Sequence, residues 1–235
     1  MDLLTDKSVR ILVLSFVVLH MAQQLSGINA IFYYSNSFFA GVIDNPLVGT
    51  TLVGAVNVLA TYIALFLMDR TKRVTLLLLS MGGMLVCAAL VTFALMEILP
   101  SSIAVLGVMG FVSFFEIGLG PITWLIVAEM FDAKYVSTAM SVASQINWAS
   151  NFIVGLSWPW MAVTLGEFSF LPFGAVLLFT FVFTWRYMPE TAGKSIAELH
   201  WTINNSEENG TMANESGKSP HVEYLVVEAV DLSMN

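Results

Sequence analysis

Residues 20–34 place polar side chains inside a long apolar run. Two sets of small or polar residues recur there at helical spacing: His20, Gln23, Gln24 and Gly27 on one face, then Ser26, Asn29 and Tyr33 on another. Because the two faces point in different directions, we expect the helix to bend or unwind near Gly27. Lipid offers no hydrogen bonds to the backbone groups freed by such a break. The sequence therefore predicts a discontinuous membrane helix whose polar side faces protein or water.

Three further apolar segments carry polar faces of the same kind. The first has Thr50, Gly54, Asn57 and Thr61, the second has Glu116, Gly120, Thr123 and Trp124, and the third has Ser144, Asn147, Trp148 and Asn151. In the second, Pro121 is expected to disturb the helix by removing a hydrogen bond. Amides offer donors and acceptors without charge, and an indole offers a flat apolar face. Such a lining suits a sugar, although the same residue types also join membrane helices to one another.

Some of these side chains keep more than one interpretation. Glu116 is a hydroxyl acceptor, an ion-pair partner or a proton carrier, and His20 is a proton-transfer group or simply hydrogen-bonded. Tyr33 and Tyr34 form either a gate or an interfacial aromatic belt. The sequence has no nucleophile–base set, phosphate-binding glycine loop or metal-ligand cluster. We therefore expect no enzyme activity, no cofactor, no metal and no nucleic-acid partner.

The composition, with 57% hydrophobic and 11% charged residues, indicates a membrane protein that crosses the bilayer several times. Six transmembrane segments are predicted at about residues 11–40, 47–68, 75–99, 102–131, 136–165 and 170–188. Under this alternation all nine basic residues lie on one side, which the positive-inside bias assigns to the cytoplasm. The N-terminal segment 1–10 and the tail 189–235, expected to be mostly disordered, are then both cytoplasmic.

The six segments differ from one another in a way that repeats. The first and fourth are long and contain glycine breaks, the second and fifth carry polar stripes, and the third and sixth are almost entirely aliphatic or Phe. This pattern predicts an all-α membrane fold built from two inverted three-helix repeats, an arrangement typical of secondary transporters.

Five motifs keep the order and nearly the intervals of one known family: Gln23–Tyr34, Phe114–Glu116 with Gly118–Trp124, Val127–Glu129, Asn147–Gly155 and Pro189–Gly193. They resemble the C-terminal half of the facilitative hexose transporters, the GLUT family in the sugar-porter branch of the major facilitator superfamily. The resemblance implies the C-terminal six-helix half of that fold. It also implies facilitated diffusion of glucose or fructose by alternating access, in the plasma membrane.

The resemblance implies a role for each matching residue. The hexose would be held by Gln23, Gln24, Asn29, Asn57, Glu116, Trp124, Asn147, Trp148 and Asn151. The outer gate and the hinges would contain Gly27, Tyr33, Tyr34, Gly120 and Pro121. A cytoplasmic charge cluster that holds the outward-facing state would contain Arg70, Arg73, Glu129 and Glu190.

The sequence departs from the family pattern at several cytoplasmic positions. Val74 and Val136 stand where the family has arginine, and Ala192 stands where it has lysine. His20 to Ala22 replace a Gln-Leu-Ser triplet, as in members that also accept fructose.

Members of this family have twelve spans, and the chain matches only the second six. We therefore interpret it as a fragment, a truncated isoform or half of an assembly. Its expected partners are a hexose, the lipid bilayer, and either the N-terminal half or a full-length transporter. Two alternatives stay open: a non-transporting chain that interacts with a full-length transporter, and a proton-coupled symporter.

Overall fold

The computed structural model describes residues 7–40, 45–199 and 201–203, and all regular structure in this part of the chain is helical. The α-helices are α1 (Lys7–Leu25), α2 (Ile28–Phe39), α3 (Pro46–Met68), α4 (Arg73–Leu95), α5 (Ser101–Ile117), α6 (Leu119–Met130), α7 (Val136–Leu165) and α8 (Leu171–Tyr187). A short 3-10 helix, Gly166–Phe168, follows α7. Most of the predicted N-terminal segment and the tail beyond residue 203 lie outside the described residues.

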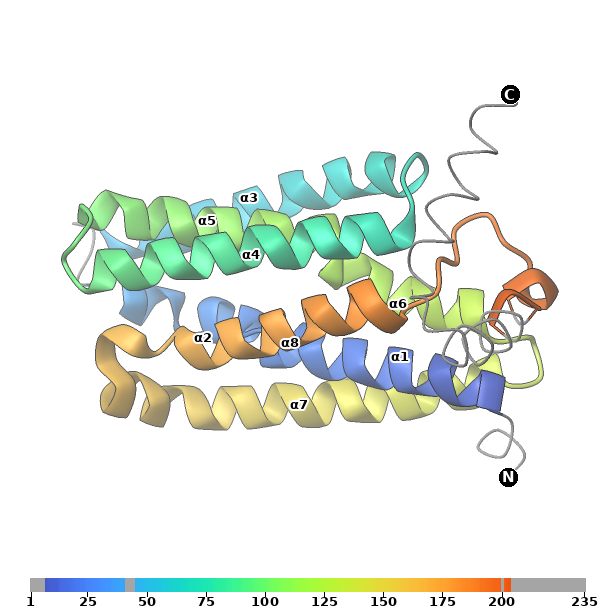
Figure 1. Ribbon diagram of the computed structural model, residues 1–235. Coiled ribbons are helices and arrows are strands. Elements are labelled where there is room, and N and C mark those ends of the chain that lie inside the picture. Colours follow the sequence, from blue (N-terminus) through green and yellow to red (C-terminus); the bar gives the residue numbers. More distant parts are fainter. Residues whose placement is uncertain (1–6, 41–44, 200, 204–235) are drawn as a thin grey trace, which may run out of the picture.

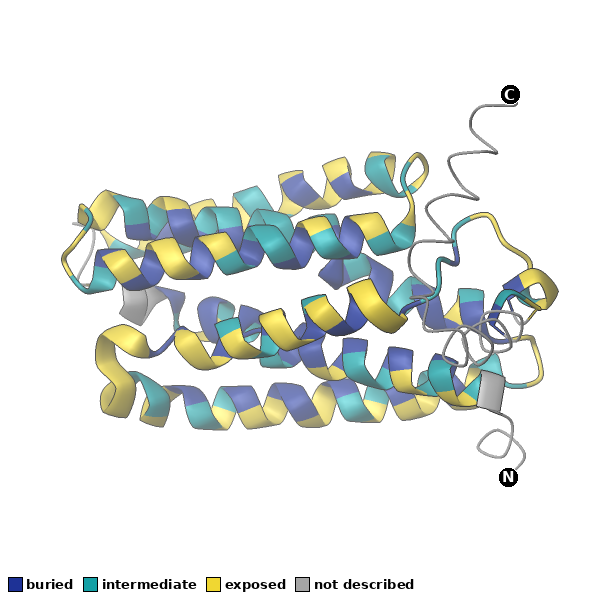
Figure 2. Ribbon diagram, in the orientation of Figure 1, coloured by how far each residue is buried: buried dark blue, intermediate teal, exposed yellow. Residues whose placement is uncertain are grey.

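The helices run side by side along one long axis (Figure 1). Helix α4 packs against α5 and α8, α1 packs against α7, and α3 packs against α5. Buried residues face the neighbouring helices, and exposed residues lie on the outside of the bundle (Figure 2). Helix α3 is the least buried of the four single helical spans: 17% of its most apolar 18-residue stretch is buried, compared with 61% for Val9–Ser35. Its exposed side chains are mostly apolar, which indicates a surface for lipid or for other protein.

Four helical segments are long and apolar enough to cross a membrane: Val9–Ser35, Pro46–Met68, Arg73–Leu95 and Ser101–Met130. Helices α7 and α8 add a fifth when they are taken together as one segment bent by 91°. The described residues thus contain four to five apolar spans. The predicted count of six and the inverted-repeat arrangement stay predictions.

The first span breaks at Gly27, where the change of helical phase predicts it. Gly27 has a φ of 88°, in the left-handed region that favours glycine. A β-carbon on Gly27 would lie 2.3 Å from a ring carbon of Phe173 in α8. Phe173 itself stacks on Trp158, with ring centroids 5.6 Å apart. Both backbone conformation and packing therefore require glycine at the junction of α1 and α2.

A second break separates α5 from α6 at Gly118. A β-carbon there would lie 2.4 Å from the carbonyl oxygen of Leu76 in α4. The amide of Leu119, the first residue of α6, donates to Oγ of Ser80 at 3.0 Å. Pro121 is the third residue of α6, where a backbone N–H has no acceptor within the helix. The disturbance that the sequence predicts near Pro121 therefore lies in the turn before it, where α5 ends and α6 begins.

The beginning of the predicted disordered tail is ordered against the bundle. Thr191, Leu199 and Ile203 are buried. Residues 196–199 are helical, and Ser195 and Glu198 form a capping box at their start. The backbone N–H of Ser195 donates to the Glu198 carboxylate at 2.7 Å and lowers the pKa of Glu198. The first residues of the predicted tail are thus ordered, and the extent of the disordered segment stays a prediction.

Candidate functional site

A polar cavity of about 420 Å³ opens between α1, α2, α5, α6 and α7. This volume falls in the range typical of small-molecule sites. Its lining residues are Gln23, Gln24, Ile28, Asn29, Phe32, Tyr33, Phe115, Glu116, Gly120, Pro121, Trp124, Asn147, Trp148 and Asn151. The breaks at Gly27 and Gly118 bring residues of both discontinuous spans to the same cavity.

The cavity gathers most of the residues that the sequence predicts to bind substrate. Asn57 is the exception, because it does not line the cavity and reaches it only through Glu116. Ile28, Phe32 and Phe115 were not predicted, although they line it. Sequence offers no signal for these three, since apolar residues occur on every side of a membrane helix.

Gln24 is the centre of a buried amide cluster. Its Nε2 donates to Oδ1 of Asn147 at 2.9 Å. Its Oε1 accepts from Nδ2 of Asn151 at 3.0 Å and from Nδ2 of Asn29. Oδ1 of Asn151 in turn accepts from the Tyr33 hydroxyl at 3.1 Å. One glutamine therefore orients cavity side chains from α2 and α7.

Gln23 ties α1 to the start of α6. Its Nε2 donates to the carbonyl oxygens of Gly120 at 2.7 Å and Leu119 at 3.2 Å. Its Oε1 accepts from Nδ2 of Asn147 at 2.6 Å. Both N–H groups and the oxygen of Gln23 are thus used within the protein. By contrast, Asn29 keeps its amide oxygen without a hydrogen-bond partner among the described residues.

Glu116 forms a second polar group with side chains of α3. Its Oε1 accepts from Nδ2 of Asn57 at 2.5 Å, and its Oε2 accepts from the Thr61 hydroxyl at 3.2 Å. Within the described part of the chain, Glu116 makes no ion pair. This geometry suits a hydroxyl acceptor, because each carboxylate oxygen can accept a further hydrogen bond and Glu116 lines the cavity.

The aromatic residues occupy two different settings. Trp124 is half-buried, whereas Trp148 is 64% exposed at the cavity edge. Tyr33 is also exposed, and Tyr34, which does not line the cavity, donates to the carbonyl oxygen of Gly155 at 3.0 Å. The two tyrosines therefore connect α2 to α7.

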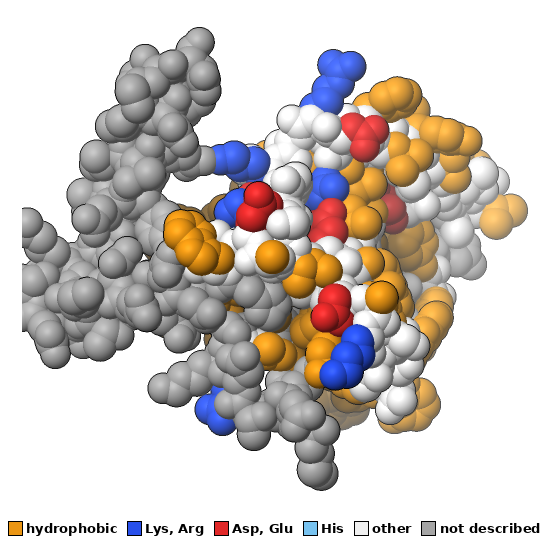
Figure 3. All heavy atoms as spheres, turned by 90° about the vertical axis from the view of Figure 1, so that its right-hand side faces the viewer, with side chains coloured by type: hydrophobic (Ala, Val, Ile, Leu, Met, Phe, Trp, Pro, Cys, Tyr) orange, Lys and Arg blue, Asp and Glu red, His pale blue; other side chains and the backbone are white. Residues whose placement is uncertain are grey.

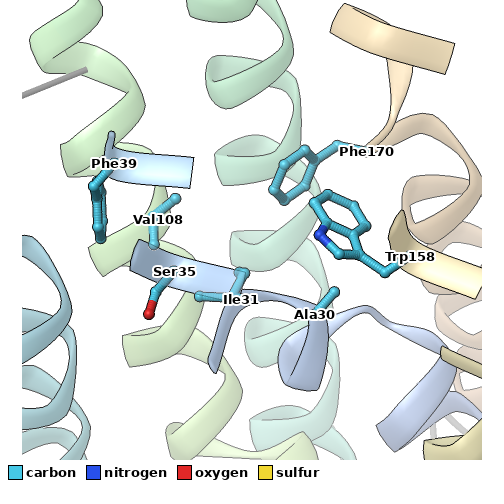
Figure 4. Close-up of a pocket in the computed structure, with 7 residues that line it drawn as sticks. All are labelled: Ala30, Ile31, Ser35, Phe39, Val108, Trp158 and Phe170. Atoms are coloured by element: carbon cyan, nitrogen blue, oxygen red, sulfur yellow. The ribbon is translucent and has the colours of Figure 1, made fainter. Parts of the chain in front are cut away.

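A second pocket lies behind α2 and is almost entirely apolar (Figure 4). Its volume of about 10 Å³ is close to that of a single water. Apart from the indole of Trp158, the lining has one polar side chain, Ser35, which already interacts with the Thr50 hydroxyl at 3.1 Å. This pocket is too small for an organic ligand, and the polar cavity is the candidate site.

Charged side chains gather at the end of the bundle where α1 and α4 begin (Figure 3). Arg73 donates to Glu129 through Nη2 at 2.9 Å and through Nε at 3.1 Å. Thr191 of the tail also donates to Glu129. Glu190 accepts from the backbone N–H groups of Arg73 at 2.8 Å and Val74 at 3.1 Å.

The predicted charge cluster is therefore assembled in part. Arg73, Glu129 and Glu190 meet, but Glu190 caps the first turn of α4 instead of pairing with an arginine side chain. Arg70 is exposed, and in the described ranges it forms no ion pair with these carboxylates.

Replacing Glu190 with alanine should release the start of the tail. The change leaves the first backbone N–H groups of α4 without their carboxylate acceptor. Losing a cap of this kind lowers the stability of the folded segment by about 1 kcal/mol. We expect trypsin to cleave after the exposed Lys194 roughly five-fold faster, since a loss of this size exposes the segment more often. Glu167→Ala, an exposed acid in the turn after α7, is the matched control. Equal cleavage of the two variants would contradict the capping role.

Comparison with known families identifies relatives of this chain. The model of the family described as "Sugar (and other) transporter" matches residues 1–202. The facilitated glucose transporter member 4 of solute carrier family 2 from Homo sapiens is 42% identical over 215 residues, which cover 89% of this chain and 42% of that protein. Member 3 from Canis lupus familiaris is 41% identical over 236 residues, which cover 98% of this chain and 47% of that protein. The chain thus spans less than half the length of these relatives.

Solved structures of sugar transporters share the fold. A major facilitator superfamily proton:xylose symporter bound to 6-bromo-6-deoxy-D-glucose superimposes with a TM-score of 0.74 at 26% identity. The aligned region covers 81% of this chain and 42% of the symporter. An inward-open xylose transporter from E. coli gives the same TM-score and identity.

Proposed function

Because the chain belongs to the sugar transporter family, we propose that it supplies the C-terminal half of a hexose-binding cavity and takes part in facilitated hexose diffusion. The observation that supports this proposal most is the uncharged amide cluster around Gln24, which faces a cavity large enough for a sugar. Amides and indoles suit neutral hydroxylated rings, since they supply donors, acceptors and flat apolar faces without charge.

The hydrogen bonds made within the protein indicate which polar side chains still have a donor or acceptor for a sugar. We propose that Asn29, Asn151 and Glu116 hold sugar hydroxyls, since each has capacity left after its contacts within the protein. Trp124 and Trp148 would cover the apolar face of the ring. Gln23, Gln24, Asn147 and Asn57 would hold these groups in place and add hydrogen bonds to the sugar when the cluster opens.

Facilitated diffusion is favoured over proton coupling. The relatives at 41–42% identity are named facilitated glucose transporters, whereas the proton:xylose symporter is 26% identical.

We propose that the chain, which is an integral multi-pass membrane protein, crosses the bilayer six times. Helix α7 has 30 residues and is about 45 Å long, already longer than the ~30 Å hydrocarbon core. A single crossing therefore cannot contain both α7 and the 17 residues of α8. The two discontinuous spans, α1–α2 and α5–α6, then occupy equivalent places in two inverted three-helix repeats.

The charged end of the bundle is proposed to face the cytoplasm, with both termini, in the plasma membrane. Alternating access would bend the chain at Gly27 and at Gly118, next to Gly120 and Pro121. Tyr33 and Tyr34 would act as part of the outer gate. The cluster of Arg73, Glu129 and Glu190 would hold the cytoplasmic end closed in the outward-facing state, with Arg70 joining it only after a rearrangement.

The decisive experiment uses the purified 235-residue chain in lipid nanodiscs and in proteoliposomes. We expect D-glucose to bind with about millimolar affinity and L-glucose not to bind, since the site reads the arrangement of hydroxyls. Trp124→Ala should weaken binding about ten-fold through loss of the aromatic face. Trp160→Ala is the matched control, because Trp160 is 70% exposed on α7 and does not line the cavity.

Proteoliposomes then separate binding from transport. Saturable D-glucose flux would establish transport by this chain, and stereoselective binding without flux would restrict its role to one wall of the cavity. Equal binding of the two glucose enantiomers would overturn the proposal.

A further inference from the structure

One buried side chain next to the cavity stands apart from the amide cluster. His20 lies on α1, three residues before Gln23, and none of its surface is exposed. The backbone of Thr123 lies beside its ring, yet neither ring nitrogen makes a hydrogen bond of acceptable length and angle in the described structure. An unpaired polar group is costly to bury. The contact that His20 does make is between its ring and a neighbouring aromatic side chain.

The ring of His20 lies perpendicular to the indole of Trp124. The ring centroids are 4.8 Å apart and the ring planes are inclined by 87°. Edge-to-face contact is one of the two geometries that aromatic rings favour. Trp124 lines the cavity, whereas His20 does not, so the imidazole supports the indole from the side away from the cavity.

The position of His20 is itself fixed by the amide cluster. Its carbonyl oxygen accepts from Nδ2 of Asn147 at 3.3 Å. The same Asn147 accepts from Gln24 and donates to Gln23. Any displacement of His20 would therefore be resisted by the groups that form the polar wall of the cavity.

We propose that His20 is a positioning residue that holds the Trp124 indole at the cavity wall. The proposal rests on the proposed function only in taking Trp124 as a contact for the hexose. Because the contact with Trp124 is made between two aromatic rings, a phenyl ring replaces the imidazole with little loss. A side chain without a ring leaves the indole unsupported.

The first test observes Trp124 directly, without sugar. The full chain is produced with 5-fluorotryptophan in lipid nanodiscs, and the 19F resonance of Trp124 is assigned from its loss in Trp124→Phe. His20→Ala should shift and broaden this resonance and leave those of the other five tryptophans in place. His20→Phe should keep it narrow.

The second test measures D-glucose affinity. His20→Ala should weaken binding about two- to ten-fold, the range of one aromatic pair, and His20→Phe should stay within about two-fold of the parent. The double variant with His20→Ala and Trp124→Ala should bind no more weakly than Trp124→Ala alone, because the histidine acts through the indole.

Phe16→Ala is the matched control. Phe16 is buried on the same helix and makes an edge-to-face contact with Phe131, with centroids 5.8 Å apart, but neither residue lines the cavity. Its loss should lower stability without moving the Trp124 resonance.

An unchanged Trp124 resonance in His20→Ala would overturn the inference, as would equal loss of affinity in His20→Phe and His20→Ala. If the parent chain binds no D-glucose, the proposed function fails, and the fluorine spectra alone still decide whether His20 positions Trp124.

Discussion

Replacing Gly118 with alanine should lower the free energy of unfolding by about 3 kcal/mol, the upper part of the range for overpacking a tight site. The added β-carbon would lie 2.4 Å from the Leu76 carbonyl oxygen and 2.7 Å from Cβ of Ser80. The first contact is with helix backbone, which cannot turn away as a side chain can. Moving α4 would also weaken the bond from the Leu119 amide to Ser80. The measurement is denaturant unfolding of the purified chain in mixed micelles.

The control for this prediction is the same substitution in open space. Gly54 lies inside α3, and a β-carbon added to it would have no atom outside its own helix within 4 Å. Gly54→Ala should therefore stabilise the chain slightly, by up to about 1 kcal/mol, through helix propensity. Gly118→Ala within 0.5 kcal/mol or so of the parent would show that α4 and α6 do not meet as closely as described.

Gln24→Ala should weaken D-glucose binding by about 100-fold, because several cavity groups lose their partner at once. Asn29 and Asn151 would both lose their acceptor, and Asn147 would lose a donor. The unpaired amides then hydrogen-bond to water or to one another and no longer present a fixed arrangement to the sugar. Affinity is measured by equilibrium binding of labelled D-glucose in nanodiscs.

Two variants bracket this expectation. Asn29→Ala removes one peripheral amide and should lower D-glucose affinity only about five-fold, which corresponds to the loss of a single hydrogen bond. Gln145→Ala makes the same chemical change as Gln24→Ala at an exposed position of α7 outside the cavity, and should bind as the parent does. A larger loss from Asn29→Ala than from Gln24→Ala would refute the central place of Gln24. Size-exclusion profiles of all variants identify any loss caused by misfolding.

Sequence periodicity predicts the discontinuous first span well. A change of polar phase at Gly27 is a local property of the chain, and the structure breaks the helix at that residue. In the second discontinuous span the composition indicates a break but not its position. Gly118 and Gly120 are equivalent in the sequence, and the contact of Gly118 with α4 distinguishes them.

The polar stripes identify which residues face inward but not what each one touches. Gln23 and Gln24 are neighbours of the same type, yet Gln23 holds the start of α6 while Gln24 orients Asn29 and Asn151. Likewise, Asn57 lies on a predicted stripe but reaches the cavity only through Glu116. A stripe fixes the direction of a side chain around its own helix, whereas its partner depends on how the neighbouring helix is rotated.

The sequence by itself determined the class of this protein: a helical membrane protein with a polar, sugar-compatible interior, a conclusion that rests on composition and on the 3.6-residue period. Tertiary structure alone decided the apolar part of the wall at Ile28, Phe32 and Phe115, the capping of α4 by Glu190, and the contact between His20 and Trp124. The cap and the ring contact join residues far apart in the chain, and the apolar wall residues carry no polar pattern in the sequence. Local patterns cannot specify them, because they arise only when helices pack.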